Sequence, residues 1–359
     1  MATDVANAHE SRGRQPSPST PFPEDVECAP LVTLGLSRLL AGDVSEHSRL
    51  YAASKELGFF YLDLSGCQQG SGLLDSANSL FDISRDFFDL PLVTKRQYDF
   101  AEQAKYYGYK GMGAEVIDGK GTLDRNEIYN IPKDDILCIA EPVPSPELIA
   151  SKRDLLKTYI NQNNDVIQML FNSLTSSMKL PPTSSFAARH RLSEPSGCHV
   201  RFIHAPPQEV NDRRTALGEH TDFGSLTILF NRIGGLQVLL PDTSKWVYVR
   251  PMPGCAIINL GDAMVKFTAG VLRSNMHRVI SPPGRQAELK RYSLVYFCRP
   301  ENDIKLARLR GGDIDALAAT DEESTEGESA AEWLHRRHMG RKVQWENWEN
   351  SKGTDAARL

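Results

Sequence analysis

Short runs of strand-forming residues, separated by turn residues, fill the second half of the chain and limit its fold more than any other feature. From Gly197 onward, runs rich in Val, Ile, Leu and aromatic residues alternate with turn pairs such as Gly234-Gly235, Pro241-Asp242, Pro253-Gly254 and Gly261-Asp262. This pattern predicts strands over residues 198–203, 225–230, 236–240, 246–250, 255–260, 277–280 and 291–297. Regular short strands of this kind are typical of a sandwich or a barrel.

The spacing of apolar residues indicates that the first half of the chain is mainly helical. Helices are predicted over residues 46–57, 72–89 and 146–178, with a short β run over 30–34, an aromatic-rich strand over 59–64 and a loop over 106–121. An acidic loop over 320–329 and a final helix over 330–341 follow the strands. Because the helices come first and the strands second, the predicted class is α+β, with helices supporting an all-β core.

The length of 359 residues is typical of one large domain with extensions. Residues 1–26 lack periodicity and are rich in Pro and Ser, so we expect a disordered N-terminal tail. Residues 27–190 are expected to form an N-terminal region of helices and strands, and residues 191–310 the strand-rich core. The acidic loop, the C-terminal helix and a tail make up residues 311–359.

Charge and hydropathy point away from several classes of partner. The net charge of −5 gives no sign of the basic surface that binds nucleic acid, and no apolar run is long enough to cross a membrane. The six cysteines form no CxxC pair, which favours reduced thiols over a zinc site. We therefore expect a cytoplasmic protein, and a monomer by default. The C-terminal residues Ala357-Arg358-Leu359 resemble a peroxisomal address, which is the alternative location.

A candidate metal site begins with His220-Thr221-Asp222, where a histidine is followed two residues later by an acid, as at no other of the nine histidines. A polar strand edge would explain this pair equally well. On a strand, however, residues 220 and 222 point the same way, and His277 in another predicted strand can supply a third ligand. Two histidines and one carboxylate leave three positions open on iron(II), enough for a substrate and O2. Zinc accepts these ligands too, but a zinc hydrolase needs only one open position.

The sequence Arg291-Tyr292-Ser293 opens the last strong strand and suggests a second element of the site. Alternation along the strand puts Arg291 and Ser293 on one face together with Val295 and Phe297. An arginine and a hydroxyl on an apolar strand can bind a carboxylate through charge-assisted hydrogen bonds. A surface arginine paired with an aspartate is the alternative. The otherwise apolar strand, fourteen residues after His277, favours the carboxylate anchor.

These residues resemble those of the 2-oxoglutarate/iron(II)-dependent dioxygenases of the isopenicillin-N-synthase-like family, and in particular its fungal natural-product tailoring members. The resemblance covers about residues 28–345. It rests on Gly58-Phe59-Phe60, Glu127-Ile128-Tyr129-Asn130-Ile131-Pro132, His220-Thr221-Asp222, Gly234-Gly235-Leu236-Gln237-Val238, Asn259-Leu260-Gly261-Asp262, Leu272-Arg273-Ser274-Asn275-Met276-His277-Arg278-Val279 and Arg291-Tyr292-Ser293.

The resemblance implies a double-stranded β-helix, or jelly roll, as the catalytic core of residues 191–310. It implies iron(II) on His220, Asp222 and His277, and 2-oxoglutarate held through its distal carboxylate by Arg291 and Ser293. With O2, such an enzyme hydroxylates, desaturates, cyclises or rearranges a small organic molecule, and secondary-metabolite biosynthesis is the expected setting. The alternative is an iron(II) oxidase like isopenicillin N synthase, which uses no 2-oxoglutarate and binds a substrate carboxylate with the Arg-x-Ser pair.

One departure from the family pattern concerns the cosubstrate. Many relatives carry a Tyr and an Asn where this chain has Ala205 and Ile203, and neither replacement can donate a hydrogen bond. The grip on 2-oxoglutarate then rests on Arg291 and Ser293, or on His204 if a β-bulge turns it inward. The candidate substrate contacts are the Tyr106–Tyr109 loop, Phe202, Phe297 and Trp333.

Overall fold

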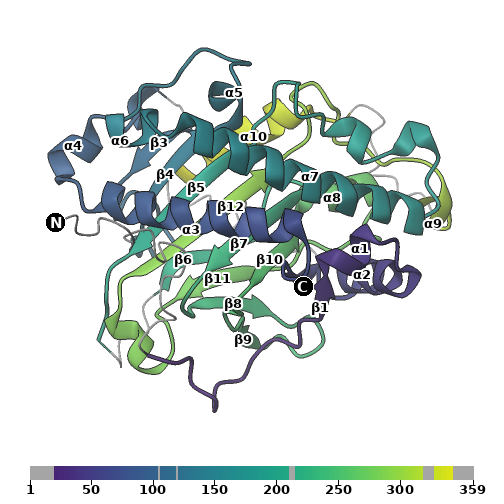
Figure 1. Cartoon of the computed structure of the whole chain (residues 1–359), viewed down its shortest axis with the longest axis horizontal. Coiled ribbons are helices and arrows are strands. Elements are labelled where there is room, and N and C mark those ends of the chain that lie inside the picture. The colour runs from purple at the N-terminus through teal and green to yellow at the C-terminus, as the bar shows by residue number, and fades with distance from the viewer. Residues whose placement is uncertain (1–19, 104–105, 119, 210–214, 318–326, 343–359) are drawn as a thin grey trace, which may run out of the picture.

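Two β-sheets form the centre of the molecule (Figure 1). Side chains from both sheets line one cavity. The computed structural model describes residues 20–103, 106–118, 120–209, 215–317 and 327–342. The large sheet contains, in spatial order, β1 (Thr33–Gly35), β2 (Phe59–Asp63), β10 (Cys255–Leu260), β7 (Leu226–Asn231), β12 (Arg291–Cys298), β5 (His199–Ala205), β4 (Glu127–Pro132) and β3 (Gly108–Lys110). The small sheet contains β6 (Thr215–His220), β11 (His277–Ile280), β8 (Leu236–Leu239) and β9 (Trp246–Tyr248). Together with the helices, this arrangement confirms the predicted α+β class with a double-stranded β-helix core.

Two long helices, α3 (Gln68–Phe88) and α7 (Arg153–Ser177), cover the outer face of the large sheet (Figure 1). The shorter helices are α1 (Leu36–Leu40), α2 (Val44–Glu56), α4 (Leu92–Arg96), α5 (Lys133–Ile136), α6 (Glu147–Ala150), α8 (Asp262–Thr268), α9 (Gly312–Asp315) and α10 (Ala330–Lys342), with 3-10 turns at Ala101–Gln103, Pro182–Ser184, Ala187–Arg189 and Gly284–Glu288. Within the described ranges, no helix combines the length and the apolar character that crossing a membrane requires. The six cysteines all lie in these ranges and are free thiols.

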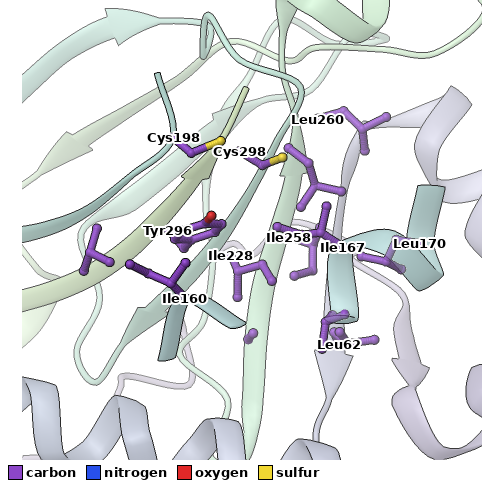
Figure 2. Packing of buried hydrophobic residues seen from close by; sticks show 14 of the residues in the cluster. Leu62, Ile160, Ile167, Leu170, Cys198, Ile228, Ile258, Leu260, Tyr296 and Cys298 are labelled. Atoms are coloured by element: carbon purple, nitrogen blue, oxygen red, sulfur yellow. The ribbon is translucent and has the colours of Figure 1, made fainter. Parts of the chain in front are cut away.

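The main hydrophobic core fills the space between the large sheet and helix α7 (Figure 2). Ile160, Ile167 and Leu170 recur at helical spacing on α7, and they belong to the same buried cluster as Ile228 and Tyr296 of the sheet. Burying each such side chain contributes roughly 1.5–3 kcal/mol. The sheet therefore has one face fixed against helices, which leaves its other face free to carry polar chemistry.

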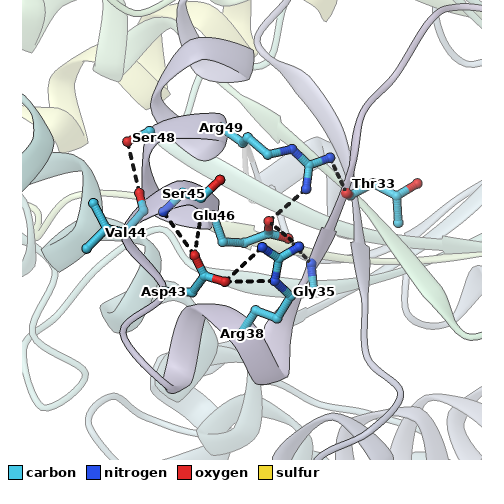
Figure 3. A network of polar contacts seen from close by, with 9 residues as sticks. All are labelled: Thr33, Gly35, Arg38, Asp43, Val44, Ser45, Glu46, Ser48 and Arg49. Atoms are coloured by element: carbon cyan, nitrogen blue, oxygen red, sulfur yellow. Dashed lines mark hydrogen bonds and ion pairs between the residues drawn. The ribbon is translucent and has the colours of Figure 1, made fainter.

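Helix α2 is tied to the edge of the sheet by a polar network (Figure 3). Asp43 caps the helix by accepting hydrogen bonds from the backbone of Ser45 at 2.9 Å and of Glu46 at 3.2 Å. The buried Glu46 carboxylate accepts one from the Gly35 backbone, at the end of strand β1, at 2.6 Å and another from Arg49 at 2.7 Å. Because β1 pairs with β2, this network also fixes β2, which lies next to β10 in the large sheet.

Several elements differ from the sequence prediction. Strands β3, β4 and β6 were not predicted, and the helix expected over 146–178 is divided into α6 and α7. Strand β6 contains Gly218, where an added Cβ would lie 2.6 Å from the Ile117 carbonyl oxygen. Because this position needs close backbone contact, β6 lacks the apolar alternation from which strands were predicted. The pair Gly261-Asp262, interpreted as a turn, instead starts helix α8. The predicted N-terminal tail and acidic loop lie largely outside the described residues, and the proposed domain boundaries stay predictions.

A buried charge cluster connects β4 to its neighbours on the side away from the cavity. The Glu127 carboxylate lies 2.7 Å from the Lys95 ammonium and 2.9 Å from Nδ1 of His204, and it also accepts a hydrogen bond from the Tyr109 hydroxyl. Burial alone would raise the pKa of Glu127, but the hydrogen bonds from His204, Lys95 and Tyr109 lower it to about 2.

We expect Glu127→Gln to lower the free energy of unfolding at pH 7 by about 3–5 kcal/mol, because Lys95 is left buried without a counter-charge. A carboxylate with a depressed pKa stabilises the fold above its unfolded pKa, so this difference should shrink as the pH falls from about 4.5 toward about 2. Urea unfolding at several pH values measures both effects. Glu27→Gln, which removes an exposed carboxylate 3.9 Å from Lys245, is the control and should change stability by less than about 1 kcal/mol. Equal stability of wild type and Glu127→Gln at pH 7 would refute the argument.

Candidate active site

Three potential metal ligands meet at the end of the small sheet. His220 is the last residue of β6 and pairs directly with His277, the first residue of β11. Nε2 of His220 lies 3.8 Å from Oδ1 of Asp222, and Nε2 of His277 lies 3.8 Å from Oδ2. All three side chains are buried, and their ligand atoms lie within 4.8 Å of one another. The structure therefore brings together the three residues that the sequence singled out.

The reason for this convergence differs in part from the sequence argument. Strand β6 ends at His220, so Asp222 lies in the turn that follows and not two positions along a strand. Backbone hydrogen bonds from Asp262 to the Asp222 carbonyl, at 2.8 Å, and from Ala263 to the Gly224 carbonyl, at 3.1 Å, hold this turn against helix α8. The position of the Asp222 carboxylate is therefore set by helix α8. The pairing of β6 with β11 positions only the two histidines.

Hydrogen bonds orient each ligand toward the centre of the cluster. Nδ1 of His220 lies 2.8 Å from the Gly218 carbonyl oxygen, and Nδ1 of His277 lies 3.1 Å from that of Asn275. Because a carbonyl only accepts, each Nδ1 carries the proton, and each Nε2 presents a lone pair. Asn259 donates to Oδ2 of Asp222 at 2.8 Å. Two imidazole Nε2 atoms and one carboxylate that converge in this way fit a divalent metal, and this ligand set suits iron(II).

Asn259→Ala should weaken iron(II) binding about 10- to 100-fold, because the Asp222 carboxylate loses the hydrogen bond that orients it. Anaerobic titration of the metal-free protein with iron(II) measures the effect. Asn78→Ala removes a different side-chain amide, one that accepts from Arg232 at 2.8 Å, and serves as the control. Unchanged iron affinity in Asn259→Ala would contradict the positioning role.

Arg291 and Ser293 lie on the inner face of β12, as strand alternation predicts. Nε of the buried Arg291 donates to the Gly234 carbonyl at 2.8 Å, and burial lowers the pKa of Arg291 to about 10, so it is still charged at neutral pH. Gly235 has φ +110°, and an added Cβ would lie 2.7 Å from the Ile280 carbonyl oxygen, so a larger residue does not fit beside this arginine. The buried Ser293 hydroxyl has no hydrogen-bond partner within the described chain. A buried cation beside an unsatisfied hydroxyl is suited to binding a carboxylate.

The metal cluster and the Arg-x-Ser pair line the same cavity. It encloses about 520 Å³ of space, its open mouth included, and its apolar wall comes from both sheets, with Phe59, Leu217, Leu229 and Val295 among its residues. Such a wall limits water around the polar groups and strengthens their electrostatic interactions. The arrangement can therefore hold a metal ion and a carboxylate ligand side by side.

The replacements Ala205 and Ile203 lie next to the carboxylate anchor. Strand pairing puts Ala205 opposite Arg291 and Ile203 opposite Ser293, and Ile203 lines the cavity. The suggestion that His204 turns inward is wrong, because β5 pairs with β12 without a register shift. Instead, His204 stacks on Tyr292 on the outer face, with ring centroids 5.0 Å apart.

The other candidate substrate contacts also differ in whether they line the cavity. Phe297 lines the cavity, whereas Phe202 belongs to the core beneath the helices and does not line it. Trp333 of α10 donates from its indole nitrogen to the Phe223 carbonyl at 3.1 Å, next to the metal cluster. Tyr106 contacts Arg201, a cavity-lining residue that the sequence analysis did not select. A charged residue at an inward position of an apolar strand, the signal that identified Arg291, would have identified Arg201 too.

Comparisons with known proteins agree with this geometry. Residues 196–300 match the 2OG-Fe(II) oxygenase superfamily, and residues 30–144 match the N-terminal region of the non-haem dioxygenases in morphine synthesis. The 2-oxoglutarate-dependent dioxygenase frbH of a Dothideomycetidae species is 32% identical over 299 residues, covering 83% of this chain and 91% of the relative. A 2-oxoglutarate-dependent dioxygenase of Aspergillus fumigatus is 30% identical over 320 residues, covering 83% and 82%.

Solved structures show the same fold. A full-length Neurospora crassa protein, crystallised in complex with alpha-KG and 5-formyluracil, superposes with a TM-score of 0.71 at 23% identity, covering 88% of this chain and 97% of the Neurospora protein. A 2OG-Fe(II) oxygenase family protein of Caulobacter crescentus gives a TM-score of 0.70 at 25% identity, covering 86% and 98%.

Proposed function

We propose that this chain, which belongs to the 2OG-Fe(II) oxygenase superfamily, oxidises a small organic molecule in secondary metabolism. It is a 2-oxoglutarate-dependent non-haem iron dioxygenase that uses iron(II), 2-oxoglutarate and O2. The observation that carries the proposal is the shared cavity, in which a His-Asp-His cluster lies beside a buried arginine and an unsatisfied hydroxyl. The fungal origin of the similar dioxygenases supports the metabolic setting. Hydroxylation, desaturation and ring formation or rearrangement all fit this cavity.

We assign a role to each of the five residues predicted from the sequence. His220, Asp222 and His277 hold iron(II), while Arg291 and Ser293 bind the distal carboxylate of 2-oxoglutarate. When bound, the metal and cosubstrate supply the oxidising power that removes a hydrogen atom from the substrate. In a hydroxylation the net balance is 2-oxoglutarate, O2 and a C–H bond converted into succinate, CO2 and an alcohol.

The residues themselves provide binding and orientation. The two Nδ1–H groups, held by backbone carbonyls, keep each imidazole in the tautomer that presents Nε2 to a metal. Asn259 holds the Asp222 carboxylate, and the Arg291 charge compensates a carboxylate in a cavity with a largely apolar lining. Ser293 adds a hydrogen bond at the position where Ile203 and Ala205 provide none.

Succinate release tests the proposed function. The purified protein, supplied with iron(II), ascorbate, O2 and 2-oxoglutarate, should form succinate, and a panel of fungal metabolites should increase the rate when it contains a substrate. O2 consumption without succinate would instead indicate the isopenicillin-N-synthase-like oxidase. Absence of both keto-acid turnover and anaerobic keto-acid binding would refute the proposal.

We propose that the protein is cytoplasmic and acts on a small molecule, because its composition gives no sign of a nucleic-acid or membrane partner, and we take a monomer as the default. The alternative peroxisomal address, Ala357-Arg358-Leu359, lies outside the described residues. Fluorescence imaging of the tagged full-length chain, with and without these three residues, separates the two locations.

A further inference from the structure

A second buried arginine, Arg201, lines the cavity on the strand next to β12. It lies on β5 opposite Val295, whereas Ile203 lies opposite Ser293 and Ala205 opposite Arg291. Four residues of a strand span roughly 13 Å and two span roughly 7 Å, so Arg201 lies well apart from the position opposite Arg291 and nearer to the position opposite Ser293. The cavity therefore has two cationic side chains at different positions, and 2-oxoglutarate requires only one of them.

The contacts of Arg201 leave its charge uncompensated. Nε donates to Oδ1 of Asn130 at 2.7 Å, a second guanidinium nitrogen donates to the Tyr106 hydroxyl, and the guanidinium lies 4.8 Å from the centre of the Phe297 ring. All of these partners are neutral, and Arg201 is 7% exposed. Among the described residues, no carboxylate forms an ion pair with it.

A second cation, Arg299, adds to this charge. It is 5% exposed, lies 5.7 Å from the Phe297 ring and approaches the same Tyr106 hydroxyl at 3.4 Å. It too has no carboxylate partner in the described part of the chain, and its Nε has no hydrogen-bond acceptor there. Burying a charge without a counter-ion costs several kcal/mol, and two like charges close together cost more. Arg201, which lines the cavity, and Arg299 behind it therefore create a positive potential suited to an anion.

His199 is consistent with this conclusion because its ring adds no negative charge to the neighbourhood of the two arginines. Nδ1 of His199 lies 2.8 Å from a guanidinium nitrogen of Arg299 and 3.1 Å from the Gly197 carbonyl oxygen, and Nε2 has no hydrogen-bond partner among the described residues. Burial, followed by the charges of Arg299 and Arg201, holds the pKa of His199 well below its usual value. The neutral ring stacks on Phe297 with centroids 4.7 Å apart. This wall of the cavity therefore offers donors and a flat apolar surface.

The charge balance of the site with metal and cosubstrate bound also favours an anionic substrate. With iron(II) and dianionic 2-oxoglutarate bound, the charges of the metal, Asp222, the cosubstrate and Arg291 cancel. Arg201 then remains on the cavity wall as a cation without a counter-charge. An anionic group on the substrate would supply it.

We propose that Arg201 binds a carboxylate of the substrate, whose apolar body packs along Phe297, and that the enzyme therefore acts on organic acids. Arg299 adds positive potential to this wall, and His199 fixes the Phe297 ring by stacking on it. A guanidinium can hold a carboxylate through two parallel hydrogen bonds, and this fixes the orientation of the attached carbon chain toward the metal cluster. The inference rests on the proposed function, since it names the substrate class of the same site.

The test uses pairs of probes that differ only in charge. Phenylacetate, 3-phenylpropanoate and 4-phenylbutanoate are each compared with their neutral primary amides, by calorimetric titration into anaerobic protein saturated with iron(II) and 2-oxoglutarate. Saturating 2-oxoglutarate keeps the probes away from Arg291. We expect at least one acid to bind wild type about 10-fold or more tightly than its amide. Failure of every acid to be preferred over its amide would overturn the proposal.

Variants then assign any preference to Arg201. Arg201→Gln should abolish the difference between acid and amide, and Arg201→Lys should keep part of it. Arg232→Gln is the matched control, because Arg232 also bonds an asparagine, at 2.8 Å, and lies 4.2 Å from a phenylalanine ring, but outside the cavity. If Arg201→Gln does not fold, Arg201→Lys decides: it keeps the charge but loses the two-pronged geometry, and an unchanged preference would count against the proposal.

The visible absorption band of the anaerobic iron(II)–2-oxoglutarate complex separates this inference from the proposed function. Absence of the band in wild type refutes 2-oxoglutarate use, and the probe titrations can then be repeated on the metal-free protein. A band present in wild type but lost in Arg201→Gln would assign Arg201 to the cosubstrate and overturn its role in substrate binding. A retained band with a lost acid preference is the expected result.

Discussion

His277→Ala should weaken iron(II) binding by more than about 100-fold and reduce 2-oxoglutarate turnover to background. Loss of a residue that merely orients a ligand already costs about 10- to 100-fold in metal affinity, and His277 supplies a ligand atom itself. Its Nε2 lies 3.8 Å from Asp222, and its ring lies 4.2 Å from that of His220, so no other described side chain of the cluster can take its place. Metal analysis after anaerobic loading and desalting gives the result directly.

His47→Ala is the control for this experiment. His47 also forms a hydrogen bond through Nδ1, to the Ser173 hydroxyl at 2.6 Å, but it lies on α2 and does not line the cavity. That variant should retain one iron per chain. A His277→Ala protein that keeps stoichiometric iron and full succinate release would show that the metal is held elsewhere.

His277 could be predicted from the sequence because it begins a predicted strand, whereas β6, the strand that ends at His220, was not predicted. His220 was selected because an acid follows it two residues later, and the pairing of β6 with β11 puts the two histidines opposite each other. Asp222 was selected for a reason that applies only in part, since it lies beyond the strand and is held by backbone contacts to α8. Helix α8 itself was missed, because its start after Gly261 resembles a turn. The position of the carboxylate therefore depends on tertiary contacts that residue spacing does not encode.

The inner face of β12 was predicted correctly, whereas the inner face of β5 was not fully interpreted. Alternation identified Arg291 and Ser293 because their strand is otherwise apolar. Strand β5 carries three basic or histidine residues on its two faces, and sequence alone does not show which of them meet a partner. His204 meets Glu127 on the outside, and Arg201 meets only neutral groups on the inside. This distinction requires β4, which the sequence pattern did not reveal.

Arg291→Gln should weaken 2-oxoglutarate binding at least about 30-fold, because a buried carboxylate that loses a hydrogen-bonded charge partner costs about 2–5 kcal/mol. The effect should be large in this chain, since Ala205 and Ile203 provide no hydrogen bond next to the anchor. Ser293→Ala removes one hydrogen bond to a charged group and should cost about 10-fold. Anaerobic titration of the iron(II) protein with 2-oxoglutarate, followed by its visible absorption band, measures both.

The two cavity arginines serve as controls for each other in this experiment. Arg291→Gln should lose cosubstrate affinity while iron binding remains, because Arg291 contacts the Gly234 carbonyl and none of the three metal ligands. Arg201→Gln should keep cosubstrate affinity, because its strand position lies roughly 13 Å from the residue opposite Arg291. Equal 2-oxoglutarate affinity in wild type and Arg291→Gln would refute the anchor. A single arginine variant could instead lose both 2-oxoglutarate binding and the preference for acidic probes. This result would show that one arginine binds both ligands. The separation of Arg201 from the residue opposite Arg291 along β5 argues against it.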